Sequence, residues 1–251
     1  MNDDYIDQHE VLCKKHGLDE PSPLDNSNLI PDITPHPEQH SPVELITPYE
    51  KSITGDELLS KITTLLTRHV YLPNGACEAI ATWCLGTYCM GNWTLYPKLL
   101  ITSPEKRCGK TTLIEVMEAL VYQGLPVSNT SASAVFRLID EYHPTLFLDE
   151  ADTFTKDNTE LNGIINAGHK KRTARVTRTE RYGNEFKAVA FSVWSPMVIA
   201  GIGNQRDTLH DRSIHIEMER KLPDERINKL PVDFFETTVQ LRRMCLRWAL
   251  D

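Results

Sequence analysis

The residues Gly109-Lys110-Thr111 have the types and spacing that bind the phosphates of a nucleotide. Glycine lets the backbone approach a phosphate closely, lysine reaches the β- and γ-phosphates, and the threonine hydroxyl is a ligand for Mg²⁺. The triplet stands between a predicted strand over 97–103 and a predicted helix over 110–122, whose N-terminus presents unpaired N–H groups to an anion. The sequence therefore predicts a Walker A loop that binds ATP with Mg²⁺. The predicted nucleotide contacts are Lys106, Arg107, Cys108, Gly109, Lys110, Thr111 and Thr112.

The loop departs from the usual Walker A pattern at Pro104, where that pattern opens with a glycine. Proline is held near a φ of about −65° and cannot take the left-handed conformation of glycine. We therefore expect the chain to enter this loop at a different angle, with Lys106 and Arg107 adding positive charge near the phosphates. The alternative is a surface turn that happens to contain Gly-Lys-Thr.

A second chemical signal is the pair of acids that ends a short apolar strand over 145–148. Such a strand followed by Asp149 and Glu150 is typical of a Walker B motif. Asp149 would hold Mg²⁺ together with Thr111, and Glu150 would orient and activate the attacking water, which indicates ATP hydrolysis. The alternative is that the acids only cap the end of a strand.

A basic segment follows, with six bases and one acid between residues 170 and 181. Two alternating runs flank Gly183-Asn184, which predicts a β-hairpin over about 173–190. Val176 and Arg178 share one face of that ribbon and Arg175 lies on the other, so the charge is spread around it. The bases would contact a phosphate backbone, or would form a protective edge strand that prevents aggregation. The predicted DNA contacts are Lys170, Lys171, Arg172, Arg175, Arg178 and Arg181.

Two more candidates lie near the end of the predicted sheet. Asn204 follows a strand over 197–202 that we expect between the two Walker strands, where a polar side chain can contact the γ-phosphate, the role called sensor 1. Arg212 begins a further strand and is a candidate arginine finger for the nucleotide of a neighbouring subunit. The alternative for this arginine is a surface pair with Asp211.

The elements that must position these residues alternate between strand and helix. Helices are expected over about 54–68, with Thr54 and Glu57 as a capping box, and from Asn74 to about 90. Beyond residue 93, alternating strands and helices predict an α/β fold, a P-loop NTPase of AAA+ type with a parallel sheet covered on both faces. An amphipathic helix over 232–249 would form a partial lid. The expected organisation is an arm over 1–50, a helical part over 51–92, an ATPase core over 93–222 and a C-terminal helix over 223–251.

Charge and composition limit what the remaining parts of the chain can be. The 251 residues carry a net charge of −8, and residues 1–50 hold eleven acids, two bases and seven of the fifteen prolines. Such a segment buries too little apolar surface to offset its chain entropy, so we expect a disordered arm. The six cysteines contain no CxxC pair, which indicates free thiols and a cytoplasmic protein. No apolar run is long enough to predict a membrane span.

With these residues assembled, the chain resembles an uncharacterised ATPase domain of primase- and helicase-like proteins from phages, plasmids and genomic islands. The resemblance covers residues 54–222 and is carried by LLITSPEKRCGKTTLIEVMEAL, SNTSASAVFRLIDEYHPTLFLDEADTF, LNGIINAGHKKR and SPMVIAGIG…TLHDRSIHIEMER. More distantly the chain is similar to superfamily 3 and minichromosome-maintenance helicases. The resemblance implies a ring-forming Mg-ATP-dependent motor on DNA, preferentially single-stranded, with the hairpin before sensor 1 contacting the DNA.

Two functions remain open at this point. One is a DNA-dependent ATPase, a helicase-like enzyme of a mobile element. The other is a nucleotide-gated interaction switch in partition, transposition or phage defence, without unwinding. The basic hairpin favours the first, and the short C-terminal segment favours the second. That segment, with no primase domain before the ATPase, predicts a shortened relative or one subunit of a split system with a separate primase or replication partner.

Overall fold

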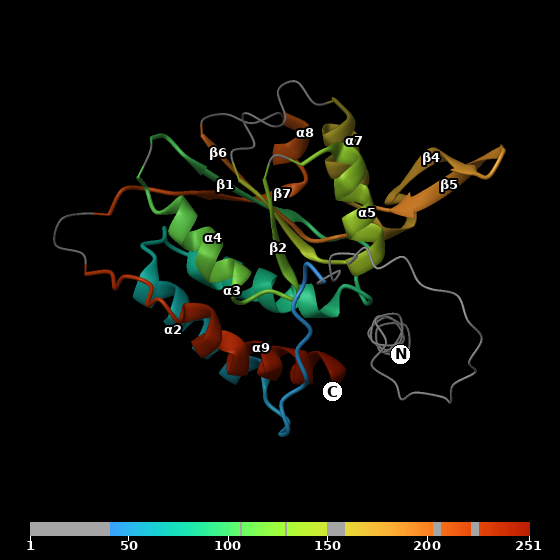
Figure 1. Cartoon of the computed structure of the whole chain (residues 1–251). Helices are drawn as coiled ribbons and strands as arrows, with labels where there is room; N and C mark the ends of the chain where they lie inside the picture. Colours follow the sequence, from blue (N-terminus) through green and yellow to red (C-terminus); the bar gives the residue numbers. More distant parts are fainter. Residues whose placement is uncertain (1–40, 106, 129, 150–158, 203–206, 222–225) are drawn as a thin grey trace, which may run out of the picture.

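A five-stranded parallel sheet forms the centre of the molecule (Figure 1). The computed structural model describes residues 41–105, 107–128, 130–149, 159–202, 207–221 and 226–251. The strand order is β2-β3-β6-β1-β7, and every pairing between neighbours is parallel. The predicted α/β class with a parallel sheet is confirmed. The strands are β1 (Lys98–Ser103), β2 (Gly124–Val127), β3 (Thr145–Leu148), β6 (Met197–Ile202) and β7 (Ser213–Glu217).

Helices cover both faces of this sheet, because alternate strand residues point to opposite sides. In β1, Leu99 and Ile101 join one core cluster, and Leu100 joins the other. The first cluster includes side chains from α2 (Gly55–His69), α3 (Ala76–Gly86), α4 (Lys110–Glu118) and α9 (Phe234–Leu250). The second includes side chains from α5 (Ala132–Tyr142) and α7 (Thr159–Ala167). Short helices η1 (Thr87–Cys89), η2 (Lys171–Thr173) and α8 (Asp207–His210) complete the described elements.

A two-stranded antiparallel ribbon projects from the body, as the sequence predicts (Figure 1). It consists of β4 (Arg175–Tyr182) and β5 (Glu185–Ser192), joined at Gly183-Asn184. Val176, Arg178 and Glu180 are partly buried, whereas the residues between them are exposed. The face that carries Arg178 therefore packs on the body, and the face that carries Arg175 is directed outward.

The start of the second helix differs from the prediction. Thr54 caps α2 as expected, since its Oγ1 accepts a hydrogen bond from the Glu57 N–H at 3.2 Å. Asn74, however, is not the cap of α3. That position belongs to Gly75, which has a φ of 77° and makes no side-chain cap. A left-handed glycine reverses the chain here, so no polar side chain is needed to start the turn.

The last ten residues of the predicted arm, 41–50, contact the body at several points. Val43 is buried in the second core cluster, and Glu44 forms an ion pair with Arg242 of α9 at 2.8 Å. The Tyr49 N–H donates to the Arg243 carbonyl at 3.0 Å. The rest of the predicted arm lies outside the described residues.

Within the part of the chain that the structure describes, no helix has both the length and the apolar character to cross a membrane. The described cysteines, which are Cys77, Cys84, Cys89, Cys108 and Cys245, are all free thiols.

Candidate functional site

The predicted phosphate loop connects the carboxyl end of β1 to the first turn of α4. Gly109 precedes that helix with a φ of 82°, and no side chain caps its N-terminus. The N–H groups of the first turn are therefore open toward the loop, which is the arrangement that binds an anion. Thr111 is exposed and Thr112 partly exposed in this turn.

The described part of the loop is held by its own hydrogen bonds. The Ser103 hydroxyl and the Cys108 thiol both donate to the Glu105 carbonyl, at 2.7 Å and 3.4 Å. Arg107 has a φ of 67°, unusual for a residue with a side chain. The left-handed turns thus fall at Arg107 and Gly109, so the loop does not need a glycine at Pro104.

Lys110 is anchored across the carboxyl edge of the sheet. Its Nζ donates a hydrogen bond of 2.7 Å to the carbonyl oxygen of Gly201 on β6. Gly201 pairs with Thr102 at the end of β1, so the ammonium lies where these two strands end. A cation placed there faces the same edge as the helix N-terminus.

Asp149 follows β3 at this same edge, because Leu148 pairs with Ile199 and all these strands are parallel. Since β6 lies between β3 and β1, Asp149 and the loop are separated by about two strand spacings, ~10 Å. The Asp149 and Thr111 side chains are both exposed oxygen donors on either side of β6. Mg²⁺ is usually held by one or two protein oxygens together with phosphate oxygens and water, so this donor set fits Mg-ATP.

A cavity of 720 Å³ opens beside the phosphate loop, and sequence reasoning missed its other walls. Arg107, Cys108, Gly109 and Thr112 line one side of it. The opposite side comes from the end of α2 and from residues 219–221 and 227–230. Its volume lies within the range of roughly 300–1,000 Å³ that holds a ligand of nucleotide size.

Two hydrogen bonds join those far walls. The Asn228 N–H donates to the Arg68 carbonyl at 3.0 Å, and the Asn228 carbonyl lies 3.1 Å from Nδ1 of His69. One contact joins two backbone groups and the other joins the His69 side chain to a backbone carbonyl, more than 150 residues away in sequence. No local motif signals them.

Three predicted site residues, Lys106, Glu150 and Asn204, lie outside the described residues. The strand that leads to Asn204 is β6, and it does lie between β3 and β1 as expected. Their roles remain predictions.

Arg212 lies at the opposite edge of the sheet from the phosphate loop of its own chain. It precedes β7 at the amino end, where the next residue, Ser213, pairs with Lys98 at the start of β1. Its guanidinium is partly buried and donates to the Asn166 carbonyl at 2.9 Å. A finger role therefore requires a second subunit and is a prediction that the single chain leaves open.

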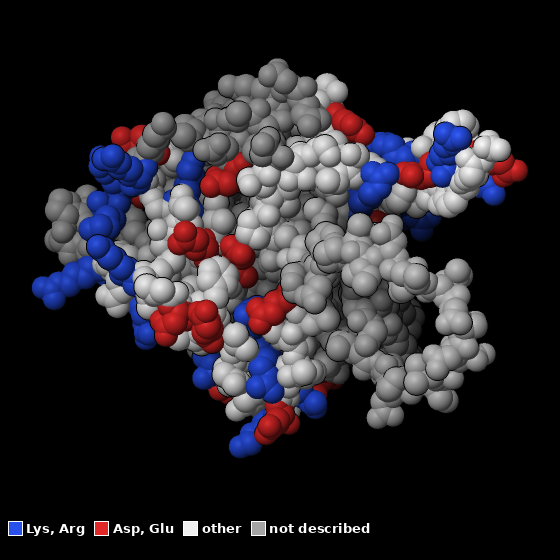
Figure 2. Space-filling model, in the orientation of Figure 1, with Lys and Arg blue, Asp and Glu red and all other residues white. Residues whose placement is uncertain are grey.

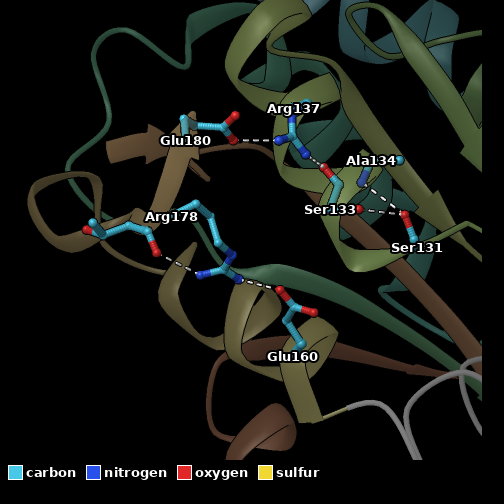
Figure 3. A network of polar contacts seen from close by, with 8 residues as sticks. Ser131, Ser133, Ala134, Arg137, Glu160, Arg178 and Glu180 are labelled. Carbon is cyan, nitrogen blue, oxygen red and sulfur yellow. Dashed lines mark hydrogen bonds and ion pairs between the residues drawn. The ribbon is translucent and has the colours of Figure 1, made fainter. Parts of the chain in front are cut away.

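Arg178 is directed into the body of the protein (Figure 3). It forms an ion pair with Glu160 of α7 at 2.6 Å, and its guanidinium lies 5.1 Å from the ring centre of Phe136. On the same face, Glu180 pairs with Arg137 of α5 at 2.6 Å. These contacts fix the ribbon to two helices, so the structure places Arg178 in a positioning role.

The other predicted DNA contacts are exposed. Lys171 donates from Nζ to the Gly91 carbonyl at 2.8 Å, and Lys170 forms an isolated bridge with Leu95. Arg181 donates from Nε to the Gly183 carbonyl at 2.8 Å near the ribbon tip. Lys and Arg side chains alternate with acids along the projecting ribbon (Figure 2). The exposed members of the set are Lys170, Lys171, Arg172, Arg175 and Arg181.

Comparison with solved structures finds distant similarity. One similar structure is the A form apo structure of the NrS-1 C-terminal region (305–718), with a TM-score of 0.39 and 12% identity over 81% of this chain. A second structure of that region has a TM-score of 0.42 and 12% identity, again over 81% of this chain. The chain spans 46% and 47% of those structures. No family model matches the sequence, and no curated protein does.

Proposed function

We propose that the chain is a Mg-ATP-hydrolysing ATPase that acts on DNA, a helicase-like motor of a mobile genetic element. The observation that supports this most is the Lys110 ammonium held over the carboxyl edge of β1 and β6. Lys110 belongs to the first turn of α4, which has no side-chain cap, and its neighbours Gly109 and Thr112 line a cavity of suitable size. This combination of cation, N–H groups and cavity suits a triphosphate and the base attached to it.

The chemistry assigned to the chain follows from its residues. Lys110 and the first N–H groups of α4 would hold the β- and γ-phosphates, and Thr111 with Asp149 would hold Mg²⁺, which neutralises charge on the phosphates. Glu150 would orient the attacking water and accept its proton. The nucleoside would occupy the cavity between Gly109 and the 226–230 segment.

The DNA-binding part of the proposal rests on the outward face of the ribbon. Arg175 and Arg181 share this face, and Lys170, Lys171 and Arg172 lead into its root. Exposed lysine and arginine side chains bind the phosphates of a nucleic acid without sequence preference. Single-stranded DNA is the expected substrate.

The test is the ATP hydrolysis rate with and without single-stranded DNA, for wild type and for Glu150→Gln. We expect turnover that DNA stimulates in wild type, and retained ATP binding with no turnover in the variant. Equal turnover in both proteins would exclude Glu150 as the base.

One observation favours the alternative, a nucleotide-gated switch without unwinding. The Arg212 guanidinium donates to Asn166 of its own chain, so a single subunit already uses the group that a ring would need. The switch would bind and slowly hydrolyse ATP as a monomer. The size of the protein in solution with Mg-ATP, by size-exclusion chromatography with light scattering, separates the two.

A further inference from the structure

A second cavity lies at the amino edge of the sheet, away from the phosphate loop. It has a volume of 210 Å³ and lies at the root of the ribbon, beside the residues that precede β2, β3 and β6. The strands are four to six residues long, which separates the two edges by about 13–20 Å. The cavity is therefore a different site from the one proposed for ATP. Its lining includes Gln123, Tyr142, His143, Lys171, Arg175 and Trp194.

Gln123 is the unusual member of this lining. Its side chain is only 8% exposed, and among the described residues neither Nε2 nor Oε1 has a hydrogen-bond partner. Gln123 has a φ of 47°, which is unusual for a residue with a side chain. Its carbonyl accepts a hydrogen bond from the Thr145 N–H at 3.0 Å, which holds the residue directly before β2. A buried amide that lacks both partners destabilises the folded state by about 1–3 kcal/mol. Such a group in a folded protein calls for an explanation, and a ligand that supplies the missing donor and acceptor is one.

The rest of the lining indicates which ligand. The half-buried rings of Trp194 and Tyr142 give flat apolar walls, while Lys171 and Arg175 are exposed at the rim. Trp194 is held in place by a hydrogen bond from Nε1 to the Met90 carbonyl at 3.3 Å. Aromatic walls stack with planar rings, and a carboxamide pairs with adjacent donor and acceptor atoms on the edge of a base.

The volume limits the ligand further. Cavities for drug-sized molecules measure roughly 300–1,000 Å³, so 210 Å³ admits one ring system rather than a whole nucleotide. The attached sugar and phosphate would remain at the rim beside Arg175 and Lys171. Arg175 also belongs to the outward face of the ribbon, together with Arg181 at the tip. A DNA single strand bound along this face would pass the mouth of the cavity.

We propose that this cavity receives one unpaired base of a bound DNA single strand, and that the Gln123 carboxamide pairs with the edge of that base. The proposal rests on the DNA binding proposed above. It adds a contact to a base where the ribbon supplies contacts to phosphates.

The experiment compares wild type with Gln123→Met, which keeps the length of the side chain and removes the amide. Neither side chain is branched at Cβ, so the strain at the positive φ is matched in the two proteins. Binding of fluorescent twelve-nucleotide strands of dA, dC and dT, and of a strand of abasic sites, is measured by anisotropy without ATP. For wild type, we expect at least one homopolymer to bind about tenfold more tightly than the abasic strand.

In Gln123→Met, that preference should fall several-fold, because only stacking on Trp194 and Tyr142 remains, while binding to the abasic strand stays unchanged. The melting temperature should rise, because the unpaired amide is gone. Equal preference for the base-containing strand in both proteins would overturn the proposal and leave the cavity without a role in base recognition. If the wild-type protein binds the abasic strand as tightly as every homopolymer, the base-binding role of the cavity is wrong, but the proposed DNA binding stands. If the wild-type protein binds no strand at all, the proposed DNA binding itself is wrong.

A further experiment tests whether the bound base belongs to a DNA strand or to a free nucleotide. AMP, CMP and dTMP are titrated against both proteins while the tryptophan fluorescence, to which Trp194 contributes, is followed. We expect weak binding, since a mononucleotide lacks the contacts along the ribbon. Mononucleotides that bind as tightly as the strands, with the same dependence on Gln123, would overturn the strand in favour of a free nucleotide.

Discussion

Lys110, the first residue of α4, donates a hydrogen bond of 2.7 Å from Nζ to the carbonyl oxygen of Gly201 on β6. The lysine is thus held over the carboxyl edge of the sheet by a strand that follows it by 91 residues in sequence. A phosphate that binds the loop would replace the neutral carbonyl as the acceptor for this ammonium, and the bond between two charged groups is the stronger of the two. Exchange of that bond would also change what holds the end of β6, the strand that leads to Asn204.

Gly109 should tolerate no side chain, for conformational reasons. Its φ is 82°, whereas the nearest atom to an added Cβ is Met218 Cε at 3.8 Å, so space is available. We expect Gly109→Ala to lower the free energy of unfolding by about 1–2 kcal/mol and to weaken ATP binding. Urea denaturation and nucleotide titration measure the two effects.

Gly163 is the matched control for that substitution. It lies within α7, is exposed, and an added Cβ meets no atom within 4 Å. Gly163→Ala should therefore stabilise the protein by about 0.5–1 kcal/mol and leave ATP binding unchanged. A Gly109→Ala protein that behaves like Gly163→Ala would show that the left-handed turn is not required.

Lys98 should contribute to the pH dependence of the free energy of unfolding, and its substitution should remove that contribution. Its side chain is 2% exposed, Nζ has no hydrogen-bond partner among the described residues, and burial with the nearby Arg212 charge lowers the pKa from 10.5 to about 8. Below pH 8 the folded state bears the full cost of a buried charge. Between pH 8 and 10.5 the unfolded chain binds more protons, so stability increases with pH.

Lys98→Met should therefore be more stable than wild type at pH 7, by about 1–3 kcal/mol. The advantage should shrink as the pH rises from 8 to 10.5. Denaturation of both proteins across this range tests the sign, because the other titrating groups are common to both and cancel in the difference. An advantage that is constant or grows with pH would contradict the assignment.

The arginines of the ribbon should separate into two kinds. Arg178→Gln loses the ion pair with Glu160 and the contact with Phe136, so the ribbon should loosen and its amides should exchange hydrogen faster. Glu160→Gln should produce a similar loosening, since it removes the same pair. Arg181→Gln should leave exchange unchanged at the ribbon root.

Arg181→Gln should instead change DNA binding. Each lost phosphate contact lowers the slope of log affinity against log salt concentration by about 0.7 on single strands. Substitution of Arg172, Arg175 and Arg181 together should lower the slope by about 2. An unchanged slope would favour the protective role of a basic edge strand.

Arg212 tests whether subunits cooperate. If it acts on the nucleotide of a neighbour, Arg212→Ala should bind ATP and hydrolyse it poorly, since such fingers contribute about 10³–10⁵ in rate in other enzymes. A mixture of Arg212→Ala with Lys110→Ala should then recover activity, because an interface can combine an intact loop with an intact arginine. A mixture that stays inactive would assign Arg212 to holding Asn166 within its own chain.

Local patterns predicted most of the sheet. The apolar runs at 145–148 and 197–202 became β3 and β6 with those bounds, and the ribbon turns at Gly183-Asn184. The position of β6 between the two other strands is also confirmed. These features follow from short-range hydrophobicity and turn chemistry, which the sequence displays directly.

Features that depend on distant partners were not predicted. Residues 41–50 are ordered by Val43 burial and by the Glu44–Arg242 pair, whose partners are 198 residues apart. Alternation places Arg178 beside Val176 but does not show that Glu160 of α7 pairs with it. The far wall of the large cavity is likewise held by contacts of the residue 228 backbone with the Arg68 carbonyl and the His69 side chain of α2, which no local sequence pattern indicates.

The most direct test of the account is Mg-ATP binding to Lys110→Ala by calorimetry, with Lys61→Ala as the control. Lys61 is an exposed lysine of α2 that pairs with Glu57 one turn earlier in the same helix, at 3.3 Å, and its loss removes one positive charge without touching the loop. We predict that Lys110→Ala keeps its fold but loses Mg-ATP binding by at least about 100-fold, whereas Lys61→Ala binds like wild type. If Lys110→Ala binds Mg-ATP as tightly as wild type, the loop is not a phosphate site and the proposed ATPase is wrong.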